Sequence, residues 1–244
     1  MPISDDAVLN DLVEQALSLK SIHGKLFIDT STVHPSTSSA VAEALKAKGA
    51  HFIASPVFGA SPVAAAGKLI FAMAGSQDQI SRVSPYIQDV MGRQIINMGA
   101  DVHSSSLLKI SGNIFVIGFQ ELIAEAQVFA EKTGLGTARM EEFIGGMFGP
   151  VLESYSKRMT SGAYAPPLDT PPGFAVSLAS KDVRHALAIA EEKGCQLPTL
   201  ETAQNRMTKA REYAGESLDS SSVYGIARLE AGLPFWSENS RQGN

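Results

Sequence analysis

Residues 105–132 predict one long helix whose apolar side chains occupy more than one stripe. At ~1.5 Å per residue such a helix spans roughly 40 Å, which is longer than a small domain is wide. Its apolar positions include Leu107, Ile110, Ile114, Phe115, Ile117, Phe119 and Leu122. A helix that is apolar nearly all round is buried on several sides. We therefore expect a helix that links two domains and also contacts a second subunit.

Helical and strand patterns alternate along the hundred residues before this helix. Ser4 or Asp5 is expected to cap a first helix that carries Val8, Leu12 and Ala16 along one apolar face. Further helices are expected at about 35–48 and 76–92, and strands within KLFIDTST, AHFIASPV, KLIFAMAG and RQIINMG, with a Pro/Ala/Gly loop after the second strand. Strands that alternate with helices of this length predict a wound α/β sheet.

The pattern changes near residue 100, since only helical signals follow Ser104. They are broken by glycine- and proline-containing turns at 133–137, 160–173 and 214–220. We therefore place a domain boundary between residues 103 and 104. The predicted fold is an incomplete wound α/β sheet over residues 1–103, followed by an all-helical domain over residues 104–244.

Composition excludes several classes of function. A net charge of -5 without any run of Lys or Arg argues against a nucleic-acid-binding surface. The single cysteine, Cys195, rules out an intramolecular disulfide and fits a reducing compartment. The N-terminus has neither the basic start of a signal peptide nor the arginines of a transit peptide. We expect a cytoplasmic protein, or a mitochondrial one if an upstream segment is missing.

Membrane, metal and hydrolase sites are not predicted either. Gln120, Glu121 and Glu125 interrupt the long helix, so we expect no apolar stretch with the length of a membrane span. No hydrolase G-x-S-x-G motif or phosphate-binding loop occurs. The histidines form no pair at metal-ligand spacing, so we predict no metal site; they are His23, His34, His51, His103 and His185.

Lys109 and Asn113 lie four residues apart, so one face of the long helix carries both side chains. Oxidation of an alcohol by hydride transfer requires a group that removes the hydroxyl proton, and a lysine in apolar surroundings can take that part. The Asn113 carboxamide can hydrogen-bond the substrate or the amine. A solvated side chain is the more common use of a lysine, and Asn113 as a cap or turn residue stays open. Apolar neighbours argue against a solvated Lys109 side chain; they are Leu107, Leu108, Ile110 and Ile114.

Two loops follow predicted strands, and ligands of wound sheets bind outside the carboxyl ends of strands. Ser31 and Thr32 in DTSTVHP can offer hydroxyl and backbone N–H groups to a carboxylate or a nicotinamide ribose. The simpler alternative is that these hydroxyls cap the next helix. In SPVFGASP, Gly59 permits a close approach of the backbone to a ligand, although Pro and Gly would equally support a plain turn.

Three motifs resemble those of the β-hydroxyacid dehydrogenase family, and they occur along the chain in the family's order and spacing. This family includes 3-hydroxyisobutyrate, tartronate-semialdehyde and 6-phosphogluconate dehydrogenases. The family's K-x-x-x-N pair matches Lys109 and Asn113. Its C-terminal F…K-D signature matches Phe174, Lys181 and Asp182. Its substrate-loop signature matches Asp29, Ser31, Thr32, Pro35, Gly49, Pro56, Val57, Gly59, Ala64, Gly67 and Leu69.

The resemblance implies an oxidoreductase that transfers hydride between NAD or NADP and a small hydroxyacid or related carbonyl acid. It makes residues 1–103 the remnant of an NAD(P)-binding Rossmann domain and residues 104–244 a substrate and dimerisation domain. It assigns catalysis to Lys109 and Asn113. The implied substrate-binding residues are Ser31, Phe58, Gly59 and Ala60, and the implied cofactor-binding residues are Thr32, Phe174 and Lys181.

The sequence departs from the family pattern in two places. The family begins with a strand–GxGxxG–helix unit that this sequence lacks, and GLGTAR is no substitute because Arg139 fills the last glycine position. We therefore expect this chain to bind NAD or NADP weakly or not at all. Phe58 stands where the family usually has a serine that helps hold the substrate carboxylate, and Ala60 replaces a glycine. Backbone N–H groups and Ser31 are then left to bind an anion, beside an aromatic wall.

Two other functions are compatible with the same resemblance. One is a truncated, cofactor-deficient relative that acts as a dimerising non-enzyme. The other is an imine reductase-like enzyme, although imine reductases of this superfamily generally lack the lysine that Lys109 supplies. In each case we expect a homodimer built mainly from the helical domain, whose apolar anchors are Phe115, Phe119, Phe143 and Met147.

Overall fold

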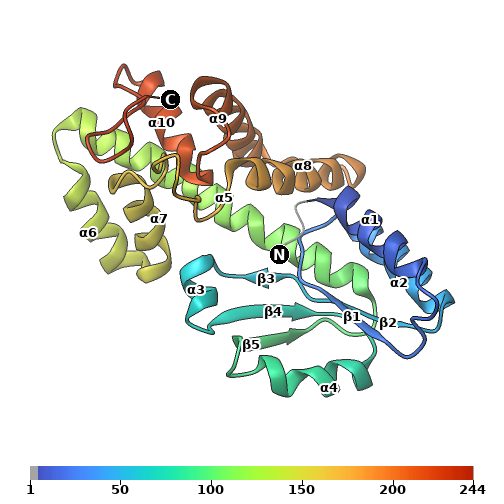
Figure 1. Cartoon of the computed structure of the whole chain (residues 1–244). Coiled ribbons are helices and arrows are strands. Elements are labelled where there is room, and N and C mark those ends of the chain that lie inside the picture. Colours follow the sequence, from blue (N-terminus) through green and yellow to red (C-terminus); the bar gives the residue numbers. More distant parts are fainter. Residues whose placement is uncertain (1–4, 244) are drawn as a thin grey trace. The chain divides into compact units, whose positions relative to one another are not determined.

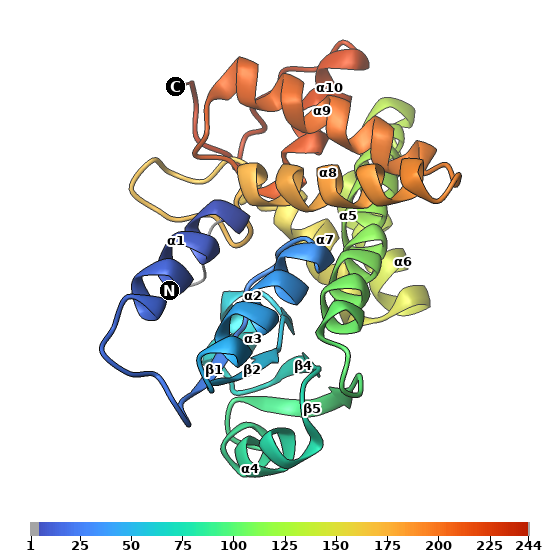
Figure 2. The same ribbon diagram turned by 90° about the vertical axis from the view of Figure 1, so that its right-hand side faces the viewer.

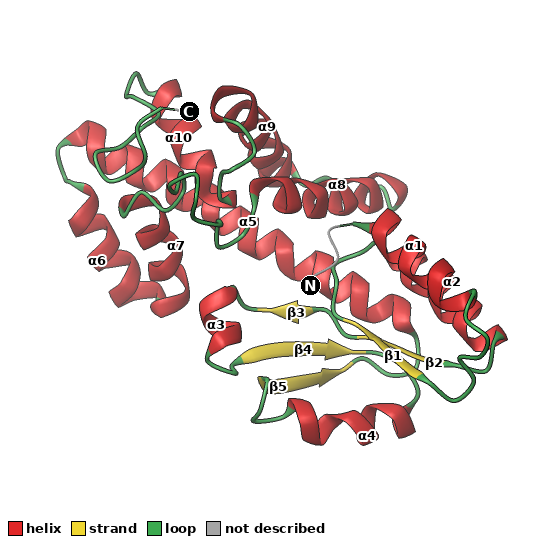
Figure 3. Cartoon of the chain, viewed as in Figure 1, coloured by secondary structure: helices red, strands yellow, loops and turns green. Residues whose placement is uncertain are grey.

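The structure is a computed structural model that describes residues 5–243. The chain forms two compact units, and the division falls within one helix, between Gly112 and Asn113 (Figure 1). The first unit is mixed α/β, and the described part of the second contains helices but no strand (Figures 2 and 3). This confirms the predicted fold class. The predicted boundary at 103/104 lies near the beginning of the same helix and stays a prediction.

Most of the strands in the first unit pair in parallel. β1 pairs with β2 in parallel, Leu26 opposite His51, and β4 pairs with β5 in parallel. The helices α2 and α4 supply the crossovers that parallel neighbours require. The elements of this unit are α1 (Asp6–Leu17), β1 (Leu26–Asp29), α2 (Pro35–Ala47), β2 (His51–Ala54), β3 (Val57–Phe58), α3 (Ser61–Ala65), β4 (Leu69–Met73), α4 (Gln77–Ile87) and β5 (Gly92–Asn97).

The segment after β2 is more ordered than the loop predicted there. It contains the short strand β3, antiparallel to β4, with Phe58 opposite Ile70, and the one-turn helix α3. Gly59 joins them with a φ of 130°, a backbone conformation that other residues rarely adopt. A two-residue strand is too short to show an alternating pattern, so its partner in β4 specifies it.

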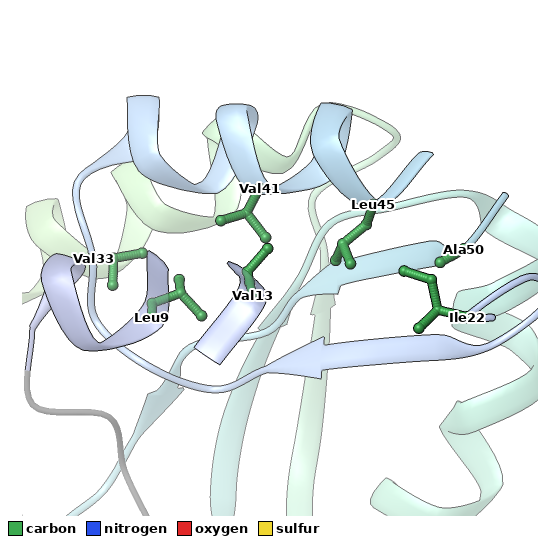
Figure 4. Packing of buried hydrophobic residues seen from close by; sticks show 7 residues of the cluster. All are labelled: Leu9, Val13, Ile22, Val33, Val41, Leu45 and Ala50. Atoms are coloured by element: carbon green, nitrogen blue, oxygen red, sulfur yellow. The ribbon is translucent and has the colours of Figure 1, made fainter. Parts of the chain in front are cut away.

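The helix α1 packs through a different face from the one predicted. Asp5 caps it as expected, since its Oδ1 accepts a hydrogen bond from the Val8 backbone N–H at 3.0 Å, whereas Ser4 lies outside the described residues. Val8 and Leu12 are exposed, and Leu9 is among the buried residues. Figure 4 shows the core that this face enters, which comprises Leu9, Val13, Ile22, Val33, Val41, Leu45 and Ala50.

The helices of the second unit pack in neighbouring pairs. α6 lies beside α7, and α8 lies beside α9 (Figure 2). After α5 (Val102–Thr133), the elements are α6 (Thr137–Phe148), α7 (Pro150–Thr160), α8 (Val176–Glu192), α9 (Pro198–Ala214), the 3₁₀ helix η1 (Ser220–Ser222) and α10 (Val223–Glu230).

The long helix α5 is buried along one side rather than on several. Ile117 and Ala124 are buried. Phe115, Leu122 and Phe129 are 68%, 59% and 64% exposed, and they recur every seven residues, so they share one face. A single chain therefore leaves one apolar face of α5 uncovered, and the expected contact of this helix with a second subunit stays a prediction.

By length and composition alone, α5 is also long and apolar enough to cross a membrane. The expectation that no stretch has this length is therefore wrong. The core helices of soluble proteins meet the same criterion. In α5 the buried positions include Gln120, Glu121 and Gln127, and polar groups of this kind are costly to place in hydrocarbon. Length and composition by themselves therefore do not assign α5 to a membrane.

Candidate active site

Two serines fix the first turns of α5 within the first unit. The Ser105 hydroxyl donates to the carbonyl oxygen of Ala72 in β4 at 2.5 Å and lies 3.2 Å from that of Ala54 in β2. The next residue, Ser106, shares a buried hydrogen bond of 2.7 Å with Ser38 of α2. Since buried hydroxyls are costly to leave unpaired, these bonds hold the helix at the carboxyl ends of β2 and β4. Lys109 follows Ser105 by one helical turn.

The Lys109 amine lies over an aromatic ring. Its Nζ is 4.6 Å from the centroid of the Phe58 ring, and both side chains are half-buried. A cation at this distance is attracted by the negative face of the ring. The same ring contacts Gly112, where an added Cβ would lie only 2.3 Å from Phe58 Cε1. The Phe58 ring thus lies against α5 from Lys109 to Gly112.

Gly59 and Ala60 hold Phe58 in place. A Cβ at Gly59 would lie 2.8 Å from side-chain atoms of both Val63 and Leu69, so a larger residue there would displace its neighbours. Ala60 is the N-cap of α3, and its carbonyl accepts from Val63 N at 2.8 Å. In the structure these two residues shape the turn that presents Phe58. Their predicted contact with substrate stays a prediction.

The carboxyl end of β1 is closed by a tight polar turn. The Ser31 backbone N–H donates to Asp29 Oδ1 at 3.0 Å, and Ser55 N donates to the Asp29 carbonyl at 2.7 Å. The cap of α2 is His34 rather than Ser31 or Thr32, since the His34 ring accepts from Ser36 N. Ser31 and Thr32 therefore do not cap α2.

A second polar group, in the other unit, surrounds Asn113. Its side chain is buried and its Nδ2 donates to Asp182 Oδ2 at 2.6 Å. The Lys181 amine is 3.2 Å from the other oxygen, Asp182 Oδ1. Asp182 therefore fixes the direction of the carboxamide and holds the predicted cofactor lysine beside it. Asp182 is part of the family motif, but the sequence predicted no role for it. Its position next to Lys181 could have indicated that the two side chains pair.

Phe174 is held by Asp219, a residue for which the sequence motifs predict no role. Its backbone N–H donates to Asp219 Oδ2 at 2.8 Å, and its carbonyl accepts from Ser220 N at 2.7 Å. Asp219 is fully buried and also accepts from Arg158 at 3.3 Å. The run LDSSS contains the signal for this turn, since an Asp before serines is a common cap.

The structure thus brings some predicted residues together and leaves others apart. Phe58 and Lys109 are in contact in the first unit, and Asp182 joins Asn113 to Lys181 in the second. One continuous helix places Asn113 a single turn after Lys109. The other predicted site residues lie at the end of β1 and in the loop before α8, and their roles stay predictions.

Comparison with known proteins decides the family. Residues 1–99 match the NAD binding domain of 6-phosphogluconate dehydrogenase, and residues 104–227 match the NAD-binding domain of NADP-dependent 3-hydroxyisobutyrate dehydrogenase. The chain belongs to the β-hydroxyacid dehydrogenase family. It is accordingly an oxidoreductase that transfers hydride between NAD or NADP and a hydroxyacid or related carbonyl acid, as the three motifs predict.

Individual members of the family resemble the chain along most of its length. The NADH-dependent oxidoreductase ucdB of Aspergillus ustus is 31% identical over 96% of this chain and 78% of its own length. The 3-hydroxyisobutyrate dehydrogenase of Pseudomonas aeruginosa is 32% identical over 86% of this chain and 72% of its own. The structure of 3-hydroxyisobutyrate dehydrogenase from Salmonella typhimurium has a similar fold, with a TM-score of 0.79 at 22% identity over 91% of this chain and 76% of that one.

Proposed function

We propose that Lys109 is the general acid and base of this dehydrogenase. The observation that carries the proposal is its position, half-buried under the Phe58 ring and one turn after the Ser105 anchor at the strand ends. Lys109 in its neutral form accepts the hydroxyl proton during oxidation, and as an ammonium it returns the proton to the oxygen during reduction. Asn113, directed by Asp182, supplies polar groups of fixed orientation one turn away.

Polar residues at the strand ends of the first unit suit a nicotinamide cofactor. At the end of β1, Ser31 and Thr32 provide hydroxyl groups, and the buried Ser55 hydroxyl has no hydrogen-bond partner among the described residues. A buried polar atom of this kind is uncommon unless water or a ligand completes it. The cofactor-binding role of Lys181 and Phe174 is proposed from the family motif alone. A bound nicotinamide cofactor would supply the hydride acceptor for oxidation or the hydride donor for reduction.

The test of catalysis compares two lysines of the same helix. Lys109→Ala should lower kcat by about 10² or more, as expected for loss of a general acid and base. Lys132→Ala is the matched control, because Lys132 is exposed in the last turn of α5, and it should leave kcat unchanged. Steady-state rates with NAD and NADP measure both. A Lys109→Ala turnover within a factor of two of the parent would remove Lys109 from the mechanism.

We further propose that the chain forms a homodimer through the exposed face of α5. Phe115, Leu122 and Phe129 form an apolar row on that face, and contiguous exposed apolar side chains of this kind mark interaction surfaces. A groove of about 490 Å³ adjoins the row, lined by Phe119 of α5 and Pro198 of α9, among others. Phe143 and Met147 of α6 are also exposed. An obligate dimer would cover more than ~2,000 Å² here.

Light scattering at low micromolar concentration tests the dimer. The parent should have twice the chain mass of 25.8 kDa, and Phe129→Asp should shift it toward the monomer because a buried carboxylate is costly. Tyr86→Asp is the control, because Tyr86 is 73% exposed on α4 of the first unit, and it should leave the dimer intact. A parent protein of monomer mass would show that the apolar row has no partner copy.

A further inference from the structure

We infer that Phe58 and Gly112 together select hydroxyacids that carry a flat apolar group, such as an aromatic ring, next to the reacting carbon. The inference concerns the substrate of the proposed site and rests on the proposed role of Lys109. It names a narrower class than small aliphatic hydroxyacids. The observations that carry it all lie in the first unit, where the positions of Phe58, Lys109 and Gly112 are fixed by their neighbours.

The backbone fixes where Phe58 lies in the first unit. Phe58 pairs with Ile70 across the antiparallel β3–β4 ladder, and Gly59 then turns the chain at a φ of 130°. Lys109 Nζ lies 4.6 Å from the ring centroid. A substrate whose hydroxyl group reaches this amine therefore has its reacting carbon near the Phe58 side chain.

Gly112 is matched to this ring. An added Cβ would lie 2.3 Å from Phe58 Cε1 and 2.6 Å from Cζ, and these are ring atoms, not the end of a flexible chain. Glycine inside a helix is destabilising relative to alanine. Position 112 nevertheless carries glycine in the interior of α5, and the space it leaves is filled by the ring. The large Phe58 ring therefore fits in this position because residue 112 has no side chain.

The chemistry of the ring decides which substrates it favours. An aromatic side chain donates no hydrogen bond to a carboxylate, so an anion placed against it loses hydration without replacement. Its face is also electrostatically negative. An aromatic group, by contrast, gains an offset or edge contact and buries apolar area. The contact between the Phe58 ring and an aromatic group of the substrate corresponds by itself to a preference of about tenfold in kcat/KM.

Two acids that differ in one substituent test the inference. They are 3-hydroxy-2-methylpropanoate and 3-hydroxy-2-phenylpropanoate, which share the hydroxymethyl carbon and the carboxylate. In each oxidation a C–H bond of that carbon breaks and its electron pair goes with the hydrogen to NAD or NADP. The O–H proton goes to the Lys109 amine, and the product is the corresponding aldehyde acid. We expect kcat/KM for the phenyl acid to exceed that for the methyl acid by about tenfold or more.

Three variants assign the preference to the pair. Phe58→Ser should abolish or reverse the preference for the phenyl acid, whereas Phe58→Tyr retains a ring and should keep it. Gly112→Ala should reduce the preference in the parent, because the ring is displaced. In the Phe58→Ser background the same substitution should have no further effect on the preference. This loss of additivity is what two coupled residues produce, and it would not arise from independent damage to the helix.

The outcomes separate this inference from the proposed catalytic role. A parent enzyme that prefers the methyl acid, or a Phe58→Ser variant that keeps the phenyl preference, overturns the inference. If Lys109→Ala still loses turnover on both acids in that case, the proposed function stands. A Lys109→Ala variant with parental turnover overturns the proposed function instead. No turnover of either acid by the parent, at NAD or NADP concentrations high enough to offset the weak binding expected without the GxGxxG unit, overturns both.

Discussion

Glu121 is a buried carboxyl group, and its removal should change how stability depends on pH. The residue is 3% exposed on α5 and is paired with Arg206 of α9. Burial raises the pKa of Glu121 from 4.5 to about 7; the attraction of Arg206 opposes this increase and does not cancel it. Because this pKa is higher in the folded protein than in the unfolded chain, the folded protein binds more protons between these two values.

The sign and size of the effect follow from this shift. The contribution of Glu121 to the free energy of unfolding is largest below pH 4.5 and is lost as the pH rises to about 7. At about 1.4 kcal/mol for each pH unit, the loss amounts to at most about 3 kcal/mol. Glu121→Gln removes the titrating group. The stability of the variant relative to the parent should therefore increase by up to about 3 kcal/mol across this range.

Chemical unfolding at a series of pH values, followed by circular dichroism, measures the difference. Glu142→Gln is the control, because Glu142 is an exposed carboxylate on α6 and is not among the groups that shift the pKa of Glu121. The control should keep the parental pH dependence. A difference between Glu121→Gln and the parent that stays constant with pH would refute the assignment of this slope to Glu121.

Two further predictions concern positioning and packing. Asp182→Asn should lower kcat by up to about 10²-fold, because the Asn113 carboxamide loses its charged acceptor, and should also destabilise the fold, because the buried Lys181 amine loses its counter-charge; unchanged kcat would show that the carboxamide orientation is set elsewhere. Gly225→Ala should lower the free energy of unfolding by about 1–3 kcal/mol, because the new Cβ would lie 2.4 Å from the Phe235 ring. Gly146→Ala, in open space within α6, should raise it by roughly 0.5–1 kcal/mol. Thermal or chemical unfolding distinguishes the two signs.

The alternation of strands and helices in the first unit was predictable because its signals are local. Apolar runs, caps and helix-ending glycines each act over a few residues, and they placed β1, β2, β4 and β5 correctly. The two-residue strand β3 was missed because its partner in β4 specifies it. The buried face of α1 was also shifted, to Leu9 instead of Val8. Apolar residues occupy both positions, so which one is buried depends on the elements that pack there.

The candidate active site was likewise predictable from the sequence only in part. Helical spacing alone placed Lys109 and Asn113 on one face of α5, and the family motif supplied the remaining candidates. The acceptor for Asn113 lies 69 residues away in the sequence, and no local pattern connects the two. The contact of Phe58 with Gly112 was equally out of reach, because it depends on how β3 turns back toward α5. Long-range partners of this kind require the folded chain.

Chemical rescue tests most directly whether Lys109 exchanges the substrate proton. Small primary amines are added to the Lys109→Ala variant, and turnover is followed as a function of amine concentration and amine pKa. We predict that turnover increases with amine concentration and that the rate constants depend on the pKa of the amine, as Brønsted behaviour requires for a general acid or base. Lys132→Ala should show no such increase. A Lys109→Ala variant that is inactive and unaffected by any amine, or one that needs none, would contradict the account.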